Sequence, residues 1–342
     1  MPRSAAPGRV RMSDVARAAG VSLVTVSRAI NTPDKVAAET LAVVRAAVAR
    51  LGYVPNLTAG SLATSRSRIV AAIVPTVSNQ VFSETVEALT RTLAEGGYQL
   101  LLGQSAYRGA DEEALVEAFL GRRVDGLVLT GCGQGAALRA RLRRAGVPVV
   151  QTWDLRGAAE GAPAAVLDMA VGFSNVAAGR AAAAHLVQRG HRAFGFIGAD
   201  EERSRQRLEG FRAGAAAAGL PDVPADLMRP PVQVDQAALQ LAQLMARRAG
   251  LDAVLCSNDL LAAGVLFECH RRGIAVPGKL AVMGFGDLPI ARAAAPQLST
   301  VRVRRTEMGE RAGQMLLARL AGHDPGARRV DIGFEVVARQ ST

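Results

Sequence analysis

Hydrophobic and polar positions in residues 11–52 follow the three- and four-residue spacing of helices, and no strand-like alternation interrupts them. Ser13 predicts the start of a first helix, residues 18–21 (Ala-Ala-Gly-Val) predict a tight turn, and Ser22 is a suitable N-cap for a second helix. Three apolar positions of these helices are expected to face the same side: Val15, Val26 and Ile30. A third helix carries apolar residues at Leu41, Val44, Val48 and Leu51. Gly52 is its expected C-terminal cap.

From residue 69 onward, short apolar runs alternate with amphipathic stretches, which predicts a parallel α/β architecture with helices on both faces of the sheets. Eight runs are expected to form strands: residues 69–74, 99–102, 126–130, 147–151, 164–167, 193–197, 253–256 and 280–283. These strands fall into two similar groups, one before and one after about residue 163. Two doubly wound lobes with a ligand cleft between them are therefore expected.

Composition excludes several classes of protein. The 342 residues are 49% hydrophobic, but no apolar run reaches the roughly 18 residues of a membrane span. The first 12 residues carry arginines without an apolar segment after them, so we expect no secretion signal and a cytoplasmic protein. The three cysteines and four histidines lack metal-ligand spacing, so we expect reduced thiols, no metal site and no cofactor.

The net charge of +11 is unevenly distributed along the chain. An arginine-rich composition explains part of the total, since only two of the 41 basic residues are lysines. Residues 1–68, however, hold ten basic residues against three carboxylates, an excess of +7 in about a fifth of the chain. This asymmetry favours a polyanionic partner for the N-terminal segment.

Residues 14–31 read DVARAAGVSLVTVSRAIN. This run resembles the N-terminal signature of the lactose/galactose repressor (LacI/GalR) family of bacterial transcription factors, DVAxxAGVSxxTVSRxxN. The resemblance implies a helix-turn-helix whose second helix enters the major groove of DNA. The alternative is that these residues only cap and cover a helical bundle.

The resemblance also implies roles for single residues in binding DNA. Leu23 and Val24 stand where the family reads base edges, and apolar side chains suit thymine methyl groups. Arg28 is the implied guanine reader, because a bidentate contact to O6 and N7 discriminates by roughly 1 to 3 kcal/mol. Four polar residues are candidates for phosphate contacts: Ser22, Thr25, Ser27 and Asn31.

Residues 53–56 (Tyr-Val-Pro-Asn) and 59–63 (Ala-Gly-Ser-Leu-Ala) resemble the family's hinge, a short helix that folds on DNA. Leu62 stands where the family places an apolar wedge for the minor groove. The other hinge residues implied to bind DNA are Tyr53, Asn56 and Ala59. Gly60 weakens a helix, and Leu57 replaces the commoner arginine. An ordinary polar linker is the alternative.

The resemblance covers nearly the whole chain and implies its organisation. It implies an all-α helix-turn-helix headpiece at 1–57, a hinge helix and linker at 58–67, and an effector-binding and dimerisation core at 68–342. The core is expected to be periplasmic-binding-protein-like, with two doubly wound α/β lobes. A homodimer on a palindromic operator is implied, and the C-terminal segment 334–342 is too short for a tetramerisation helix.

Polar residues follow the expected strands of the core, where ligands bind in such folds. We expect Asn258 and Asp259 to contact ligand hydroxyls, and Arg203 and Arg207 to clamp an anion or hydroxyl. The remaining candidates for effector binding are Asn79, Gln80, Phe82, Trp153, Asp154 and Asp287. Trp153 has interlobe core as an alternative role, and Arg203 a solvated helix face. Gly286 replaces the first of two aspartates common in the family, which puts the role of Asp287 in question.

Residues 76–82 and 168–175 resemble the gluconate-utilisation repressors within the family. A sugar-acid effector is the implication, although arginines in such a cleft also bind neutral sugars and purines. The expected mechanism is that the effector changes lobe closure and the spacing of two headpieces, most often as an inducer of a repressor.

Two other classes of function are alternatives for such a chain. An enzyme is disfavoured, because the glycine-rich run 131–135 lacks the spacing of a nucleotide-binding loop and no GxSxG motif occurs. A periplasmic sugar-binding protein would share the core, but the first 65 residues argue against it.

Overall fold

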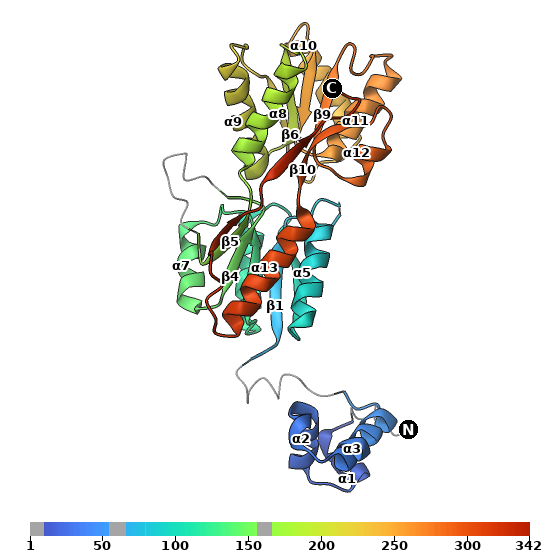
Figure 1. The fold of residues 1–342 in the computed structure, drawn as a ribbon, viewed down its shortest axis with the longest axis vertical. Helices are drawn as coiled ribbons and strands as arrows, with labels where there is room; N and C mark the ends of the chain where they lie inside the picture. Colours follow the sequence, from blue (N-terminus) through green and yellow to red (C-terminus); the bar gives the residue numbers. More distant parts are fainter. Residues whose placement is uncertain (1–9, 55–65, 79, 156–165) are drawn as a thin grey trace, which may run out of the picture. The chain divides into compact units, whose positions relative to one another are not determined.

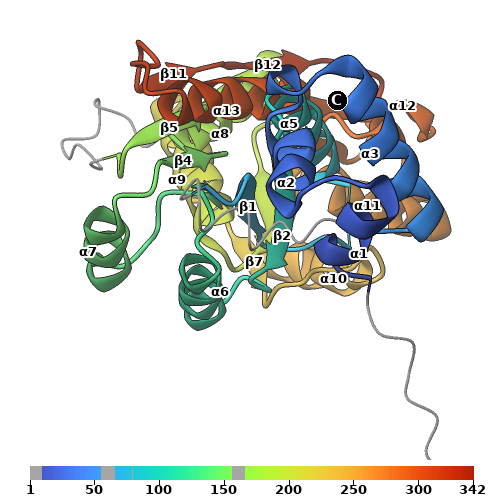
Figure 2. The same cartoon turned by 90° about the horizontal axis from the view of Figure 1, so that it is seen from below.

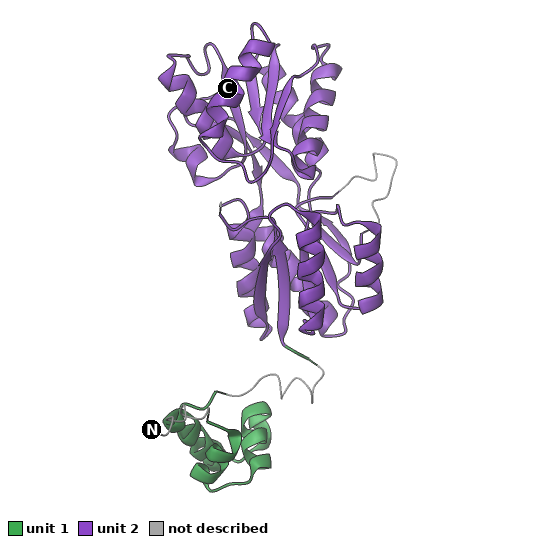
Figure 3. Ribbon diagram, turned by 180° about the vertical axis from the view of Figure 1, so that it is seen from behind, with its two compact units in different colours: residues 1–67 green, residues 68–342 purple. Residues whose placement is uncertain are grey.

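The computed structural model describes residues 10–54, 66–78, 80–155 and 166–342. The chain divides into two compact units, Met1–Ser67 and Arg68–Thr342 (Figure 3). Each unit has its own hydrophobic core, so each is described separately below.

The described part of unit 1 contains three helices, α1 (Met12–Ala19), α2 (Leu23–Asn31) and α3 (Ala38–Leu51), with a 3-10 turn at Pro33–Lys35. Gly20 and Gly52 end α1 and α3 with φ of 65° and 62°, a conformation that favours glycine. The predicted start at Ser13 is one residue late, because Arg11 is the N-cap and its N–H donates to the Asp14 carboxylate. Seven buried residues form the core: Val15, Ala16, Val26, Ala29, Val44, Ala47 and Tyr53.

Unit 2 contains two six-stranded sheets, and we call the halves built on them lobe 1 and lobe 2 (Figure 1). The lobe 1 sheet has the order β11-β5-β4-β3-β1-β2, with parallel pairing throughout. Its strands are β1 (Ile69–Val74), β2 (Gln99–Gln104), β3 (Gly126–Thr130), β4 (Val149–Thr152), β5 (Met169–Gly172) and β11 (Arg329–Asp331).

Helices cover both faces of the lobe 1 sheet: α5 (Ser83–Glu95), α6 (Gly109–Gly121), α7 (Ala136–Ala145) and α13 (Arg305–Leu320). Alternate residues of β1 enter different cores, because successive side chains of a strand point to opposite faces. Val70 and Ala72 pack in the core that holds residues of α5 and α13, whereas Ala71 and Ile73 pack with residues of α6 and α7. Figure 2 shows these two helix pairs on opposite sides of the sheet.

The lobe 2 sheet has the order β12-β10-β9-β8-β6-β7, and β12 is antiparallel to β10. Its strands are β6 (Phe194–Ala199), β7 (Ala225–Met228), β8 (Ala253–Cys256), β9 (Ala281–Gly286), β10 (Ser299–Val303) and β12 (Phe334–Val337). Its helices are α8 (Asn175–Gln188), α9 (Glu202–Ala217), α10 (Gln236–Arg247), α11 (Asp259–Arg271) and α12 (Pro289–Ala293).

The predicted boundary between the two lobes, at about residue 163, is wrong. β5, α13 and β11 all follow that point in sequence, yet they belong to lobe 1. The chain therefore crosses between the lobes after β5, after β10 and after β11 (Figure 1). These crossings tie the two lobes into one unit.

The predicted strands otherwise lie within a few residues of the observed ones, with one exception. The run 164–167 was predicted to be a strand, but its described part precedes β5, which begins at Met169. Four observed strands were not predicted from the sequence: β7, β10, β11 and β12. No helix in the described ranges is long and apolar enough to cross a membrane.

Candidate DNA-binding face and ligand cleft

Helix α2 separates its buried from its exposed side chains sharply. Val26 and Ala29 lie in the core of unit 1, whereas Leu23 and Val24 are 51% and 58% exposed and Arg28 is exposed. In the part of unit 1 that the structure describes, the Arg28 guanidinium has no hydrogen-bond or ion-pair partner, whereas the Arg28 carbonyl accepts from the Thr32 N–H and from Thr32 Oγ1. The fold alone gives no reason for two large apolar side chains to face water, so this face is available to a partner.

The polar candidates on α2 also stabilise the helix. The Ser22 hydroxyl is the N-cap, accepting from the Thr25 N–H at 3.1 Å and lying 2.8 Å from Thr25 Oγ1. Asn31 Nδ2 donates to Ser27 Oγ at 3.3 Å. These contacts orient hydroxyl and amide groups beside the exposed apolar pair, at the electropositive end of α2 in the case of Ser22 and Thr25.

The hinge candidates are mostly beyond what the structure shows. Tyr53 is buried in the core of unit 1, which gives it a structural role there. Asn56, Ala59 and Leu62 lie outside the described residues, as does the effector candidate Asn79.

A small cavity lies between the lobes of unit 2, at the carboxyl ends of β4, β6 and β8. This inner cavity has a volume of about 40 Å³. It is lined by Val81, Phe82, Tyr107, Trp153, Ala199, Glu201, Arg203, Arg207, Val232, Ser257 and Asn258. Five of the predicted effector residues therefore meet at one place: Phe82, Trp153, Arg203, Arg207 and Asn258.

A larger cavity of about 340 Å³ adjoins the inner one and shares Tyr107, Glu201 and Arg203 with it. This outer cavity has a strongly polar lining that includes Ser105, Arg108, Glu112, Gln134 and Asp200. Burial raises the pKa of the Glu112 carboxyl, against the hydrogen bond from Gln134 Nε2 at 3.1 Å. The two cavities thus lie side by side between the lobes, and we refer to them together as the cleft.

Arg207 is the most constrained polar residue of the cleft. Its side chain is 7% exposed, Nε donates to Asn175 Oδ1 at 2.9 Å, and Nη1 donates to the Ser257 carbonyl at 2.7 Å. The guanidinium also lies 3.7 Å from the centre of the Phe285 ring. Burial lowers the pKa of Arg207 to about 10, so it keeps its charge at neutral pH.

Arg203 is held by a carboxylate and an aromatic ring. Its Nη2 lies 3.0 Å from Glu201 Oε2, and the guanidinium lies 5.5 Å from the centre of the Phe82 ring. The same Glu201 carboxylate caps α9 by accepting from the N–H groups of Arg203 and Ser204. Arg203 is buried rather than a solvated helix residue.

The aromatic pair of the cleft is packed tightly. Trp153 is 2% exposed, and its ring lies 5.0 Å from that of Phe82 in an edge-to-face arrangement. Trp153 is thus part of the interlobe core and lines the inner cavity at the same time.

Three predicted aspartates lie away from the inner cavity. Asp154 is buried and accepts from Gln206 Nε2 at 3.0 Å and Asn175 Nδ2 at 3.4 Å, beside a separate pocket. Asp259 accepts from Thr300 Oγ1 and the Leu288 N–H, both at 2.6 Å, and burial raises the pKa of its carboxyl to about 6.

Asp287 accepts from Arg339 Nη2 at 2.6 Å and from Arg302 Nε at 2.8 Å. Burial alone would raise the pKa of its carboxyl, but these two hydrogen bonds and the charges of the arginines hold it below its usual value. Gln80 is exposed and is not among the residues that line the inner cavity. The contacts observed for Asp259 and Asp287 are thus structural, within lobe 2.

Tyr107, Glu201 and Ser257 also line the inner cavity and were not predicted from the sequence. A backbone signal marks this edge of the sheets: Ala106, Tyr107, Trp153 and Asp287 have φ between 50° and 70° without being glycine. Such strained residues concentrate at functional sites, and all four lie within three residues of the end of β2, β4 or β9. Arg68 and Arg123, with φ of 57° and 55°, precede β1 and β3 instead. In the described ranges no group of three or more histidine, cysteine, aspartate or glutamate side chains is arranged to hold a metal ion.

Comparisons with known proteins match both units. Residues 11–56 match the model of bacterial regulatory proteins of the lacI family, and residues 183–342 match a periplasmic binding protein-like domain. The chain is 40% identical to the HTH-type transcriptional regulator GntR of Pseudomonas aeruginosa, over 98% of this chain and 96% of the relative.

Two solved structures extend the likeness to the fold. A LacI family transcriptional regulator from Silicibacter pomeroyi aligns with a TM-score of 0.88 and 31% identity, over 97% of this chain and 99% of that one. The transcription regulator GntR from Chromobacterium violaceum aligns with a TM-score of 0.74 and 37% identity, over 80% of this chain and 98% of that one.

Proposed function

The chain belongs to the LacI family of bacterial regulatory proteins, and from this premise we propose how it acts. It is a DNA-binding transcriptional regulator with a periplasmic-binding-protein-like core. We propose that it is a homodimeric, cytoplasmic repressor of a palindromic operator, and that a small sugar acid in the cleft controls it.

The exposed face of α2 supports the proposed contact with DNA. Leu23 and Val24 read thymine methyl groups, Arg28 reads a guanine, and the hydroxyl and amide groups beside them bind phosphates. We propose a headpiece at 1–57, a hinge at 58–67 and an effector-binding core at 68–342. The division of the structure after Ser67 is in keeping with these boundaries.

The charge of the inner cavity carries the proposal of an acidic effector. Its lining includes two buried guanidinium groups, Arg203 and Arg207, and a single carboxylate, that of Glu201. The lining therefore holds more guanidinium groups than carboxylates, and a guanidinium fork matches a ligand carboxylate in two hydrogen bonds. Tyr107, Ser257 and Asn258 offer polar groups for hydroxyls. The resemblance of residues 76–82 and 168–175 to gluconate-utilisation repressors favours gluconate or a related aldonic acid.

The inner cavity is too small to hold a sugar acid, and this limits how such an effector can bind. At about 40 Å³ it has room for one or two water molecules. We propose that a sugar acid reaches Arg207 in the inner cavity by separating the lobes there, and that the outer cavity of about 340 Å³ holds the rest of the ligand. Because a ligand shifts an equilibrium only through its different affinity for the two states, the lobe arrangement that accommodates the acid is the one it stabilises, by an expected 1 to 3 kcal/mol. We propose that this change releases the operator.

Titration calorimetry with the full-length protein tests the effector class. Gluconate is expected to bind, and glucose is expected to bind about a hundredfold more weakly, because it leaves the positive charge of the cavity unpaired. Arg203→Gln should remove most of this preference for the acid. Arg212→Gln, which removes an exposed charge from the same helix outside the lining of both cavities, should preserve it. Equal binding of glucose and gluconate, or no binding of any sugar acid to the folded protein, would refute an acidic effector.

A further inference from the structure

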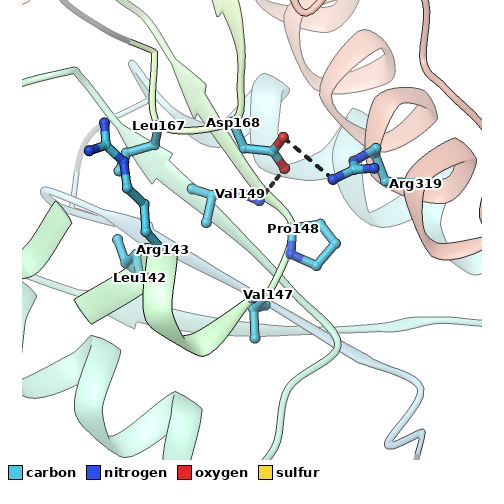
Figure 4. A pocket seen from close by; sticks show the side chains of 9 residues that line it. Leu142, Arg143, Val147, Pro148, Val149, Leu167, Asp168 and Arg319 are labelled. Atoms are coloured by element: carbon cyan, nitrogen blue, oxygen red, sulfur yellow. Dashed lines mark hydrogen bonds and ion pairs between the residues drawn. The ribbon is translucent and has the colours of Figure 1, made fainter. Parts of the chain in front are cut away.

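A further pocket lies on lobe 1, at the edge of the sheet opposite the cleft. This basal pocket has a volume of about 190 Å³ (Figure 4). It is lined by the end of α7, the loop that leads into β4, the segment before β5 and the last turn of α13. The cleft lies at the carboxyl end of β4, whereas the basal pocket lies beside Val149, at the start of that strand. The two sites are therefore separated by the length of a strand.

Guanidinium groups flank the basal pocket on two sides. Arg143 comes from the last turn of α7 and Arg319 from the last turn of α13, and Figure 4 shows them on opposite sides of the apolar side chains. The nearby carboxylate of Asp168 is shared, because Oδ1 lies 3.7 Å from Arg319 Nη2 and 3.4 Å from Arg328 Nη1. Its Oδ2 accepts from the Val149 N–H at 3.3 Å.

This arrangement leaves positive charge without a matching carboxylate. One acidic group faces two arginines, and Arg143 makes no ion pair with any residue that the structure describes. A cation at the C-terminal end of a helix is favourable by itself, which explains why α7 ends in Arg143 and Arg144. The end of α13 and the Asp168 carboxylate account for Arg319 in the same way, so Arg143 is the guanidinium of the lining whose charge no described carboxylate matches.

Apolar side chains occupy the space between the two arginines. They are Leu142, Val147, Pro148, Val149 and Leu167, of which Leu142 and Val149 are buried. An inorganic anion would use the charges but leave this apolar surface wet, whereas a neutral apolar molecule would leave the charges unused. A ligand with one carboxylate and a compact apolar body satisfies both parts of the lining. The volume is below the roughly 300 Å³ of pockets for drug-sized ligands, so the body is about the size of one ring.

We propose that the basal pocket binds a small organic carboxylate with an aromatic or branched aliphatic body. Its carboxylate pairs with the Arg143 guanidinium, and its body covers Val147, Pro148 and Leu167. This site is separate from the cleft and does not depend on the identity of the cleft ligand.

The test uses 4-fluorobenzoate as the probe, followed by fluorine NMR with the full-length protein. Binding to the wild type is expected, with an affinity about tenfold higher than that of the neutral analogue 4-fluorobenzyl alcohol. Arg143→Gln is expected to weaken the probe by about the same factor. Arg144→Gln is the matched control, since it removes the adjacent exposed charge from the same helix without touching the lining.

Several outcomes would overturn the proposal. Arg143 is exposed, so its variant is expected to fold, and equal losses in the Arg143 and Arg144 variants would show that only general charge matters. If the neutral analogue bound equally well, the arginines would not contribute to recognition. If inorganic phosphate displaced the probe efficiently, the apolar side chains of the lining would not contribute. Displacement by saturating gluconate would show that the probe occupies the cleft instead.

Discussion

The two units present their candidate functional side chains in opposite ways. In unit 1, Leu23, Val24 and Arg28 point to water, and the core that holds their helix consists of other residues. In unit 2, Arg203 and Arg207 are buried, and their partners are parts of the fold: Glu201 caps α9, and Ser257 follows β8. In unit 1, the side chains expected to bind DNA are therefore different from those that stabilise the fold. In unit 2, the arginines expected to bind the effector also stabilise the fold.

The largest effect is expected from Arg207→Ala. This change leaves Asn175 Oδ1 and the Ser257 carbonyl without their buried donor and removes a charge that faces Glu201 and Asp154. It should destabilise the protein by about 3 to 5 kcal/mol and abolish the effector response. Urea denaturation measures the first effect, and calorimetry in the absence of denaturant measures the second.

Arg205→Ala is the control for this comparison, because it removes an exposed arginine from the same helix. Its effect on stability should stay within about 0.5 kcal/mol. If the Arg207 and Arg205 variants proved equally stable, the buried contacts of Arg207 would not contribute to the stability of the protein.

The second prediction concerns the buried carboxyl of Asp259. Burial raises its pKa from the usual 3.8 to about 6, so the folded protein binds one more proton than the unfolded chain between these pH values. The contribution of this group to stability is therefore fully present below about pH 4 and falls by roughly 3 kcal/mol as the pH rises to about 6.

Asp259→Asn removes this titration. The free energy of unfolding of the wild type, measured relative to that of the variant, should decrease from pH 4 to pH 6 and then level off. A difference that stays constant over this range would mean that the carboxyl ionises normally, as expected for an exposed ligand-binding group rather than a buried structural one.

Arg28→Ala is the third test, and it belongs to unit 1. Because the side chain is exposed and has no partner in the described part of unit 1, stability should change by less than about 0.5 kcal/mol. Specific operator binding should weaken by about 1 to 3 kcal/mol, whereas binding to random DNA should weaken much less. A large loss of stability in the Arg28→Ala variant would show that a DNA-binding side chain of unit 1 also stabilises the fold, as in unit 2.

The smallest effect is expected at Ser22, where structure and recognition meet. Ser22→Ala removes the N-cap of α2 and should cost about 1 kcal/mol of stability. Ser22→Asp preserves the cap but places a negative charge on the face proposed to meet phosphates, so it should retain stability and weaken operator binding. If Ser22→Asp bound operator as tightly as the wild type, Ser22 would lie away from the phosphate backbone.

Local signals account for what the sequence predicted well. The turn at Gly20, the cap at Ser22 and the helix end at Gly52 depend on neighbours a few residues away, and the structure confirms all three. The same holds for strands such as 253–256, a continuous apolar run in a parallel sheet.

The errors have tertiary causes. β5, α13 and β11 join lobe 1 because the chain crosses between the lobes three times, and no local pattern records a crossing. β11 and β12 are short, and their exposed or half-buried residues carry little periodicity. Asp259 and Asp287 were expected at the ligand because they follow strands, but Thr300 and Arg339, distant in sequence, bind them within lobe 2.

The most direct test of the account is fluorescence anisotropy of a labelled palindromic site from the DNA upstream of the coding sequence, titrated with the full-length protein and then with gluconate. The account predicts binding at least about a thousandfold tighter than to random DNA of the same length, and release by gluconate but not by glucose. Specific binding that no sugar acid alters would contradict the proposed effector class but would still support a DNA-binding regulator. Equal affinity for the palindrome and for random DNA would contradict the central claim.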